Sequence, residues 1–114
     1  MPKVLWTDES GSIRVLKDED NRFYEVQEDG TYAGLLAYER KGTHYSLTHT
    51  YVQEGYRGRG LGTALIREAL SDLEKEHAAV TNRCPVVDRF IDKHPRFREL
   101  LDLSSRVVDD AAHD

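Results

Sequence analysis

The chain has 114 residues, of which 16 are Lys or Arg and 21 are Asp or Glu, so its formal charge is −5. This length suits one domain, and we expect a single folded domain over residues 1–114. The longest apolar run, Leu35 to Tyr38, is far shorter than the roughly 20 residues of a membrane-spanning helix. The acidic balance argues against a general nucleic-acid binder, which needs a broad basic face. We therefore expect neither a membrane nor a nucleic acid as a partner.

The N-terminal sequence and the single cysteine bear on cellular context. Residues 1–9 lack the apolar core and small-residue cleavage site of a secretory signal, which predicts a cytoplasmic protein. Cys84 cannot form an internal disulfide and has no Cys or His partner at ligand spacing, so no metal is expected. Residues 1–10 are weakly patterned and the tail from Val107 is rich in Asp and Ala. We expect both ends to be mobile around a core of about residues 12–103.

The first half of the chain predicts consecutive antiparallel strands. Ile13 and Val15 alternate with charged residues, and residues 22–27 are rich in aromatic and branched side chains. The Asp29-Gly30 step then supplies a tight hairpin turn. From residue 31 to residue 40 both faces are apolar, which is typical of a central strand covered on both faces.

A fourth strand, residues 43–52, follows a turn at Lys41-Gly42. Its aromatic and apolar side chains share one parity with His49 as far as Tyr51, whereas Val52 falls on the other. A β-bulge near Thr50 would reconcile the two phases.

After a glycine-rich segment the apolar period becomes that of an α-helix. Residues 61–77 carry apolar side chains at i, i+4 spacing, with charged residues on the opposite face. Residues 78–83 form a short candidate strand. Pro85 suits the first turn of a second helix, which ends at His94-Pro95 with His94 as a cap. The predicted order is four antiparallel strands, helix, strand, helix, an α/β (α+β) class.

Leucines near the end of the chain suggest one further element. Leu100, Leu101 and Leu103 are expected to form a last short helix or a packing strip.

The segment from Arg57 to Gly62 joins the fourth strand to the first helix. Three alternating glycines allow a sharp turn and a close approach to a ligand, and the first N–H groups of a helix lack internal partners. With two arginines and the positive end of the helix dipole, this turn favours an anion. The alternative is a surface turn with two solvated arginines. A dinucleotide fingerprint and a P-loop both match poorly, because the spacing is G-x-G-x-G and no Lys followed by Ser or Thr closes it.

The same segment fits the R-x-x-G-x-G acetyl-coenzyme A signature of the GNAT N-acetyltransferase superfamily. With Phe23, Tyr38, His49-Thr50, Val52, Cys84-Pro85 and His94-Pro95 at their spacings, residues 12–97 resemble its compact single-domain branch. The resemblance implies a minimal GNAT acyl-CoA N-acyltransferase fold. It also implies transfer of acetyl from acetyl-CoA to a primary amine of an unidentified protein or small molecule.

The resemblance also assigns the coenzyme contacts. The pyrophosphate is expected on the backbone N–H groups of the loop, and the pantetheine arm along the fourth strand, since an amide-bearing arm can pair with a strand edge. The thioester would lie near His49 and Cys84. The coenzyme-binding residues so implied are Thr50, Tyr51, Val52, Arg57, Gly58, Arg59, Gly60, Leu61 and Gly62.

Cys84 and His49 are the candidate catalytic residues. Acetyl transfer needs an acid for the departing thiolate, and most of the superfamily uses a late tyrosine, but no tyrosine follows Tyr56. Cys84 precedes Pro85 at or just before a helix N-terminus, a placement that can favour thiolate. We expect it to act either as that acid or as the acceptor of acetyl in a two-step route. The alternatives are a buried inert cysteine and, for His49, a core histidine bonded to the backbone.

One departure from the compact branch opens a second interpretation. Tyr51 and Gln53 stand where the branch usually carries an acidic residue and a proline. The alternative function is a coenzyme A-binding or interaction module with little or no transferase activity. A nucleic-acid accessory protein using Arg57, Arg59 and Arg83 is a third hypothesis, which the net charge disfavours.

The oligomeric state is left open by the sequence, with a monomer favoured. The edge strand near Ile13 either pairs with a second copy or is blunted by its charges.

Overall fold

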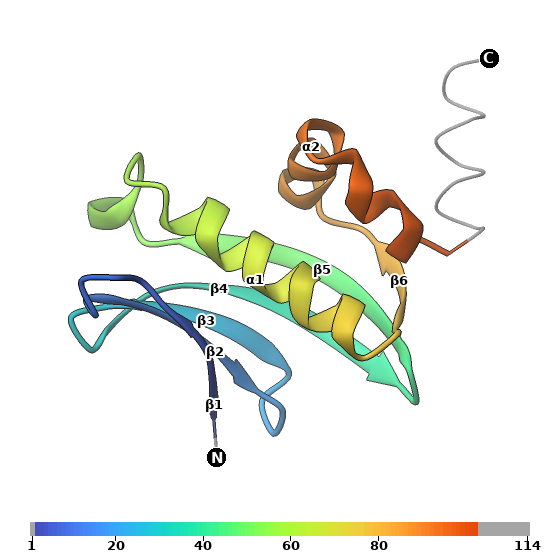
Figure 1. The fold of residues 1–114 in the computed structure, drawn as a ribbon, viewed down its shortest axis with the longest axis horizontal. Coiled ribbons are helices and arrows are strands. Elements are labelled where there is room, and N and C mark those ends of the chain that lie inside the picture. The colour runs from blue at the N-terminus through green and yellow to red at the C-terminus, as the bar shows by residue number, and fades with distance from the viewer. Residues whose placement is uncertain (1, 103–114) are drawn as a thin grey trace.

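Six strands form one sheet in the order in which they occur along the chain, in a computed structural model that describes residues 2–102 (Figure 1). Neighbouring strands are antiparallel except β5 and β6, which are parallel because a helix connects them. The strands are β1 (Lys3–Thr7), β2 (Ile13–Asp18), β3 (Phe23–Glu28), β4 (Thr31–Lys41), β5 (His44–Val52) and β6 (Ala79–Asn82). The predicted fold class and order of elements are confirmed, with one strand added at the start.

The added strand corrects the expectation that residues 1–10 are mobile. Lys3–Thr7 pairs with β2, and Trp6 packs against the core. A register shift between Val4 and Trp6 changes the side-chain phase within this short strand, which hides the period-2 pattern. One edge of the sheet is therefore β1, and the strand that contains Ile13 lies inside the sheet.

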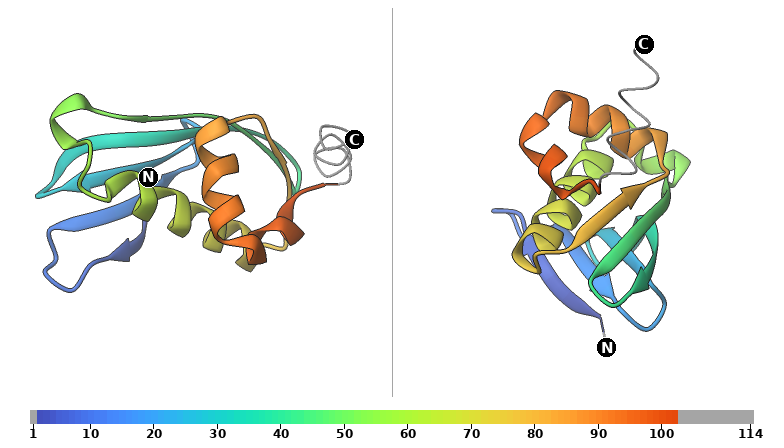
Figure 2. Two further views of the ribbon diagram at one scale, coloured as in Figure 1. Left: turned by 90° about the horizontal axis from the view of Figure 1, so that it is seen from above. Right: turned by 90° about the vertical axis from the view of Figure 1, so that its right-hand side faces the viewer.

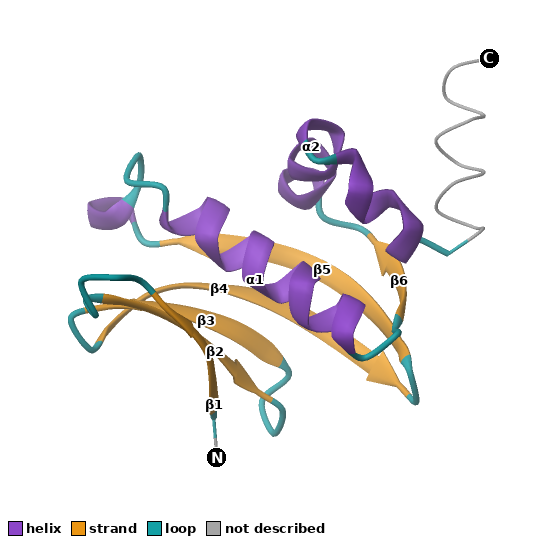
Figure 3. Ribbon diagram, in the orientation of Figure 1, coloured by secondary structure: helices purple, strands orange, loops and turns teal. Residues whose placement is uncertain are grey.

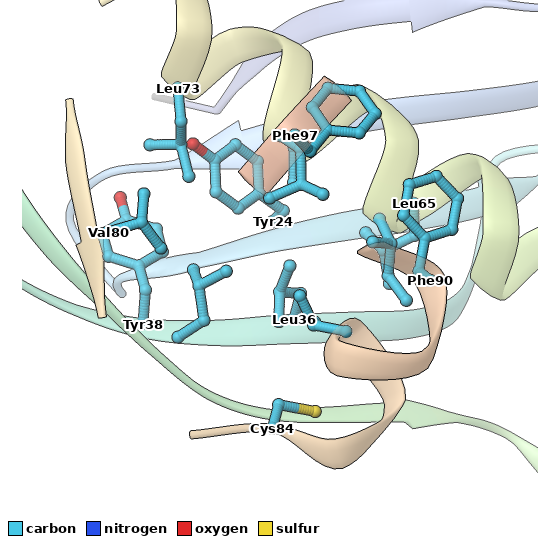
Figure 4. Packing of buried hydrophobic residues seen from close by; sticks show 14 of the residues in the cluster. Tyr24, Leu36, Tyr38, Leu65, Leu73, Val80, Cys84, Phe90 and Phe97 are labelled. Carbon is cyan, nitrogen blue, oxygen red and sulfur yellow. The ribbon is translucent and has the colours of Figure 1, made fainter. Parts of the chain in front are cut away.

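Helix α1 (Leu61–Lys75) crosses one face of the sheet and supplies much of the core (Figure 3). Figure 4 shows Leu65 and Leu73 of this helix in one cluster with Tyr24 and Leu36 of the sheet. The predicted i, i+4 apolar positions are buried. The buried residues of α1 are Leu61, Ala64, Leu65, Ile66, Ala69, Leu70 and Leu73.

The end of α1 lies two residues before the predicted position. His77 has a left-handed φ of +55°, which an α-helix cannot continue through. The His77 N–H donates to Glu74 O and the Ala78 N–H to Leu73 O, both at distances near 3 Å that close a Schellman motif.

The expectation that β4 is covered on both faces is wrong. Both helices lie on the same side of the sheet (Figure 2), where Leu36 and Tyr38 are buried. Leu35 and Ala37 point to the opposite side and are half-buried. A register shift between Val26 and Gln27, the partners of β4 residues on β3, helps to place apolar residues on both faces of this strand.

A bulge in β5 sets the orientation of the strand's second half. Ala37 pairs with His49 and Tyr38 with Leu47, which leaves Thr48 as the extra residue. The predicted bulge thus exists, two residues before Thr50. Because of it, Leu47 and Thr50 both face the helices, whereas His49 faces the other side.

The chain after β6 packs back onto α1. Helix α2 (Pro85–Lys93) and the 3₁₀ helix η2 (Pro95–Leu100) bring Phe90 and Phe97 into the core. Leu101 forms a single bridge to Val80, so the packing strip is present, and Leu103 lies outside the described residues. Within residues 2–102, no helix has both the length and the apolar character that crossing a bilayer requires.

A buried lysine anchors the C-terminal end of α1 to the sheet. Lys17 is 2 % exposed and its Nζ donates to Tyr45 Oη at 2.9 Å, to Asp72 Oδ2 at 3.0 Å and to Glu76. Tyr24 Oη also donates to Asp72, at 2.8 Å. Burial alone would lower the pKa of Lys17, but these hydrogen bonds outweigh it and raise the pKa above its ordinary value.

The carboxyl of Asp72 responds in the opposite direction. Burial alone would raise its pKa, but the hydrogen bonds from Lys17 and Tyr24 outweigh burial and hold the pKa below its ordinary value of 3.8. The pair is therefore charged at neutral pH.

Candidate functional site

The glycine-rich loop adopts a backbone conformation that requires two of its glycines. Gly58 and Gly60 have φ angles of +77° and +79°, in the left-handed region that L side chains rarely adopt. A Cβ built at either residue would meet no atom within 4 Å. Backbone geometry rather than crowding therefore selects glycine, and the space beside these two residues is open.

The loop leads directly into the N-terminus of α1. The first helical i→i−4 hydrogen bond runs from Ala64 N–H to Gly60 O at 3.1 Å. Among residues 2–102 no side chain caps the helix, and the N–H groups of Leu61, Gly62 and Thr63 have no acceptor within it. These donors and the positive end of the helix dipole favour an anion.

A pocket of about 530 Å³ lies between this loop and α2. Three of its lining residues, Arg57, Arg89 and Lys93, are cationic, and none of its described lining residues is acidic. The pocket is thus locally positive in a chain of charge −5. Its lining comprises Val52, Tyr56, Arg57, Gly58, Gly60, Leu61, Gly62, Thr63, Ile66, Val86, Arg89, Phe90, Lys93 and His94.

The two arginines of the loop have different positions. Arg57 Nε donates to Val52 O at 2.9 Å, and its guanidinium lies 5.8 Å from the centroid of the Tyr51 ring, so the residue is held at the pocket. Arg59 Nη2 donates to Glu28 Oε1 at 2.8 Å, and Arg59 does not line the pocket. Only one of the two predicted arginines therefore contributes its charge to this site.

An open stretch of β5 extends from the pocket. Pairing between β5 and β6 ends at Leu47 and Asn82, and Arg83 N–H still donates to Leu47 O at 2.9 Å. The chain then turns away into α2 at Cys84 (Figure 3). In the described chain no strand lies beside β5 beyond this point on the side away from β4, so that edge of residues 48–52 is free to pair with an extended ligand.

Cys84 lies at the N-cap position of α2, facing the open stretch. Its thiol is buried, and Sγ lies 3.3 Å from Thr50 Oγ1. The Asn82 side chain both donates to Cys84 O and accepts from Cys84 N–H, each at 3.1 Å. Figure 4 shows Cys84 at the border of the core, where α2 begins. The cysteine is therefore fixed in place beside β5.

A sequence profile described as GCN5-related N-acetyl-transferase matches residues 23–100 of the chain. The chain belongs to this family. Protein NATD1 of Mus musculus is 30% identical over 90 residues, which cover 77% of this chain and 82% of that protein. Protein NATD1 of Bos taurus is 32% identical over 85 residues, covering 73% of this chain and 75% of the relative. The predicted family is confirmed.

Domains of this acetyltransferase family generally use acetyl-CoA as the acyl donor, together with a second substrate that accepts the acyl group. The R-x-x-G-x-G segment lies at the strand-to-helix junction and on the wall of the positive pocket, in the place that the resemblance implies.

The two candidate catalytic residues lie on opposite faces of β5. His49 is exposed on the face away from the helices, and its Nδ1 lies 3.4 Å from Thr48 Oγ1. Cys84 and Thr50 lie together on the helix side. The structure thus brings Cys84 to Thr50 and not to His49, and the catalytic role of each stays a prediction.

Sequence reasoning missed the part of the site that α2 contributes. Arg89, Phe90, Lys93 and His94 all line the pocket, although only His94 received a role from the sequence, as a helix cap. His94 does occupy the C-cap position, and its ring stacks on Phe90 with centroids 4.3 Å apart. The missed signal was the i, i+4 repeat of a cation and an aromatic ring along α2, which becomes informative once that face is known to oppose the loop.

Proposed function

We propose that the protein binds acetyl-CoA and transfers its acetyl group to a primary amine. The observation that carries this proposal is the sequence of features along β5. Val52 lies in the positive pocket beside the loop, and Thr50, two residues earlier, contacts Cys84. An anion-binding pocket, an open strand edge and a fixed thiol therefore follow one another along a single strand.

The pocket residues fit a coenzyme that carries a diphosphate. Gly58 and Gly60 have left-handed backbone conformations and no side chain, so the loop backbone is accessible at these two residues. The N–H groups at the start of α1 are donors for phosphate oxygens. Arg57 adds a charge that its bond to Val52 O holds in position. The open edge of residues 48–52 would bind the amide-bearing arm of the coenzyme through main-chain hydrogen bonds.

Acetyl-CoA supplies the activated acetyl group when it is bound, and the chain orients it and handles protons. Cys84 Sγ is an ionisable group beside the open strand on its helix side, and it acts either as the acid for the departing thiolate or as the group that accepts acetyl. Thr50 Oγ1 fixes the orientation of that sulfur through the hydrogen bond between them. The acceptor amine stays unidentified.

Calorimetric titration with acetyl-CoA tests the binding step. The double variant Arg57→Glu/Gly60→Glu should lose binding, because two carboxylates repel phosphate at the loop. The matched control is Lys41→Glu/Gly42→Glu, which makes the same charge change and also replaces a glycine of positive φ, at the turn between β4 and β5. Binding by wild type and control but not by the loop variant supports the proposal. Absence of binding by the wild type contradicts it.

The alternative function is coenzyme binding with little or no transfer. Two observations favour it: the burial of Cys84, and Tyr51 where the compact branch carries an acidic residue. Turnover on a panel of amines, with Cys84→Ala and Cys84→Ser beside the wild type, separates the two functions. Wild-type turnover that falls in both variants supports a catalytic thiol. Binding without turnover on any amine supports the alternative.

A cytoplasmic location and a monomeric state stay predictions of the sequence. Fractionation of cells that express the tagged chain would test the first, and sedimentation velocity the second.

A further inference from the structure

One face of α2 presents two cations to the pocket. Arg89 and Lys93 are four residues apart, so their side chains lie on the same side of the helix. Within residues 2–102 neither forms an ion pair, whereas the exposed Arg96 and Arg98 are paired with Glu74 and Asp92. Two cations on the wall of one pocket that has no acidic lining residue make this wall favourable for an external anion.

The diphosphate alone does not account for these cations. The loop, the start of α1 and Arg57 form one wall of the pocket and provide donors and charge for two phosphates. Arg89 and Lys93 belong to α2, which forms the other wall. Coenzyme A carries a third phosphate, on the 3′ oxygen of its ribose. This phosphate is an anion that the cations of the α2 wall could bind.

An aromatic pair beside these cations fits the base of the same nucleotide. The rings of Phe90 and His94 are stacked at 4.3 Å between centroids and 28° between planes, and both residues line the pocket. Phe90 is buried, whereas His94 is exposed. A purine can therefore stack on the exposed ring, which would bring the ribose next to Arg89 and Lys93.

We propose that Arg89 and Lys93 bind the ribose 3′-phosphate of coenzyme A, with His94 against the adenine. The protein then distinguishes coenzyme A from 3′-dephospho-coenzyme A. This inference rests on the proposed function, because it assigns a further part of the same pocket. Guanidinium and ammonium groups are both suited to phosphate, the guanidinium as a two-point donor.

Calorimetric titration of the full chain with each of the two coenzymes provides the test. The wild type should bind coenzyme A about tenfold more tightly than 3′-dephospho-coenzyme A, a moderate ratio because both cations are partly in solvent. In Arg89→Gln/Lys93→Gln this ratio should fall to about one, through weaker binding of coenzyme A alone. The control Lys3→Gln/Lys41→Gln removes the same charge from two exposed lysines outside the pocket and should keep the wild-type ratio.

The outcomes separate this inference from the proposed function. Equal binding of both coenzymes by the wild type, or an unchanged ratio in the α2 variant, overturns the inference while the proposed function stands. Failure of the wild type to bind either coenzyme overturns both. Competition by adenosine 3′,5′-bisphosphate gives a second readout: it should displace coenzyme A from the wild type more effectively than from the α2 variant.

Discussion

The two ends of α1 treat their polar groups in opposite ways. At the C-terminal end, Lys17, Asp72 and Glu76 are joined to one another and to Tyr45 by hydrogen bonds inside the protein. At the N-terminal end no side chain of the described residues caps the helix, and two cations of the neighbouring pocket, Arg89 and Lys93, form no ion pair within residues 2–102. One end of the helix is satisfied by the chain itself and contributes stability. The N–H groups at the other end have no acceptor within the helix, so they can form hydrogen bonds with a ligand.

The largest expected effect tests the C-terminal end of α1, and it is a loss of stability on substitution of Lys17. Lys17→Met should lower the free energy of unfolding by about 3 kcal/mol, because it leaves the half-buried carboxylate of Asp72 without its cation. Urea unfolding would measure the loss. Coenzyme affinity should stay within about twofold of the wild type, because the two ends of the helix have no shared partners.

A matched variant separates charge from packing in this result. Lys17→Met/Asp72→Leu replaces both members of the pair with apolar residues and should regain part of the lost stability. A single variant as stable as the wild type would show that the buried pair does not anchor the helix. A large loss of coenzyme affinity in a folded Lys17→Met protein would show that the two ends are coupled.

The pH dependence of stability sharpens the same comparison. The pKa of Asp72 is lowered in the folded protein, so its contribution is present above the ordinary value of 3.8 and is lost as the pH falls through the folded value. The pKa of Lys17 is raised, so its contribution is complete below 10.5 and is lost as the pH rises through the folded value. The stability difference between wild type and Lys17→Met should therefore be constant around neutral pH and shrink in acid and in strong alkali. A difference that persists at about pH 2 would contradict this account.

The sequence predicted most of the fold because the period of apolar residues survives in long elements. The i, i+4 pattern of residues 61–77 identified α1 to within two residues. The failures occur where a bulge changes the phase. The register shift between Val4 and Trp6 interrupts the alternating pattern of β1, so this strand was not predicted. The bulge of β5 lies at Thr48 and not near Thr50, which changes the face of the sheet on which the later residues of β5 lie. A bulge is decided by pairing with a neighbouring strand, which a single segment does not encode.

The candidate site divides in the same way. The glycine loop was found because its backbone geometry demands a particular residue at Gly58 and Gly60. The contribution of α2 was missed because Arg89 and Lys93 are ordinary on a helix surface until tertiary packing places that surface opposite the loop. His49 and Cys84 lie on opposite faces of β5 because of the bulge at Thr48, and their spacing in the sequence does not reveal this.

The smallest effects are expected at two glycines of the loop, and they should differ in sign. Gly60→Ala places a Cβ at a φ of +79° and should cost about 1 kcal/mol of stability, with weaker coenzyme binding as the turn distorts. Gly62 is helical, and an added Cβ would meet only Val52 Cγ2 at 3.4 Å, an ordinary contact. Gly62→Ala should therefore raise the free energy of unfolding by about 0.5 kcal/mol through better helix propensity, and leave the N–H groups and coenzyme affinity unchanged. Chemical denaturation and calorimetry of both variants would measure this contrast; a destabilised Gly62→Ala protein would mean that the N-terminal end of α1 is packed as tightly as its C-terminal end.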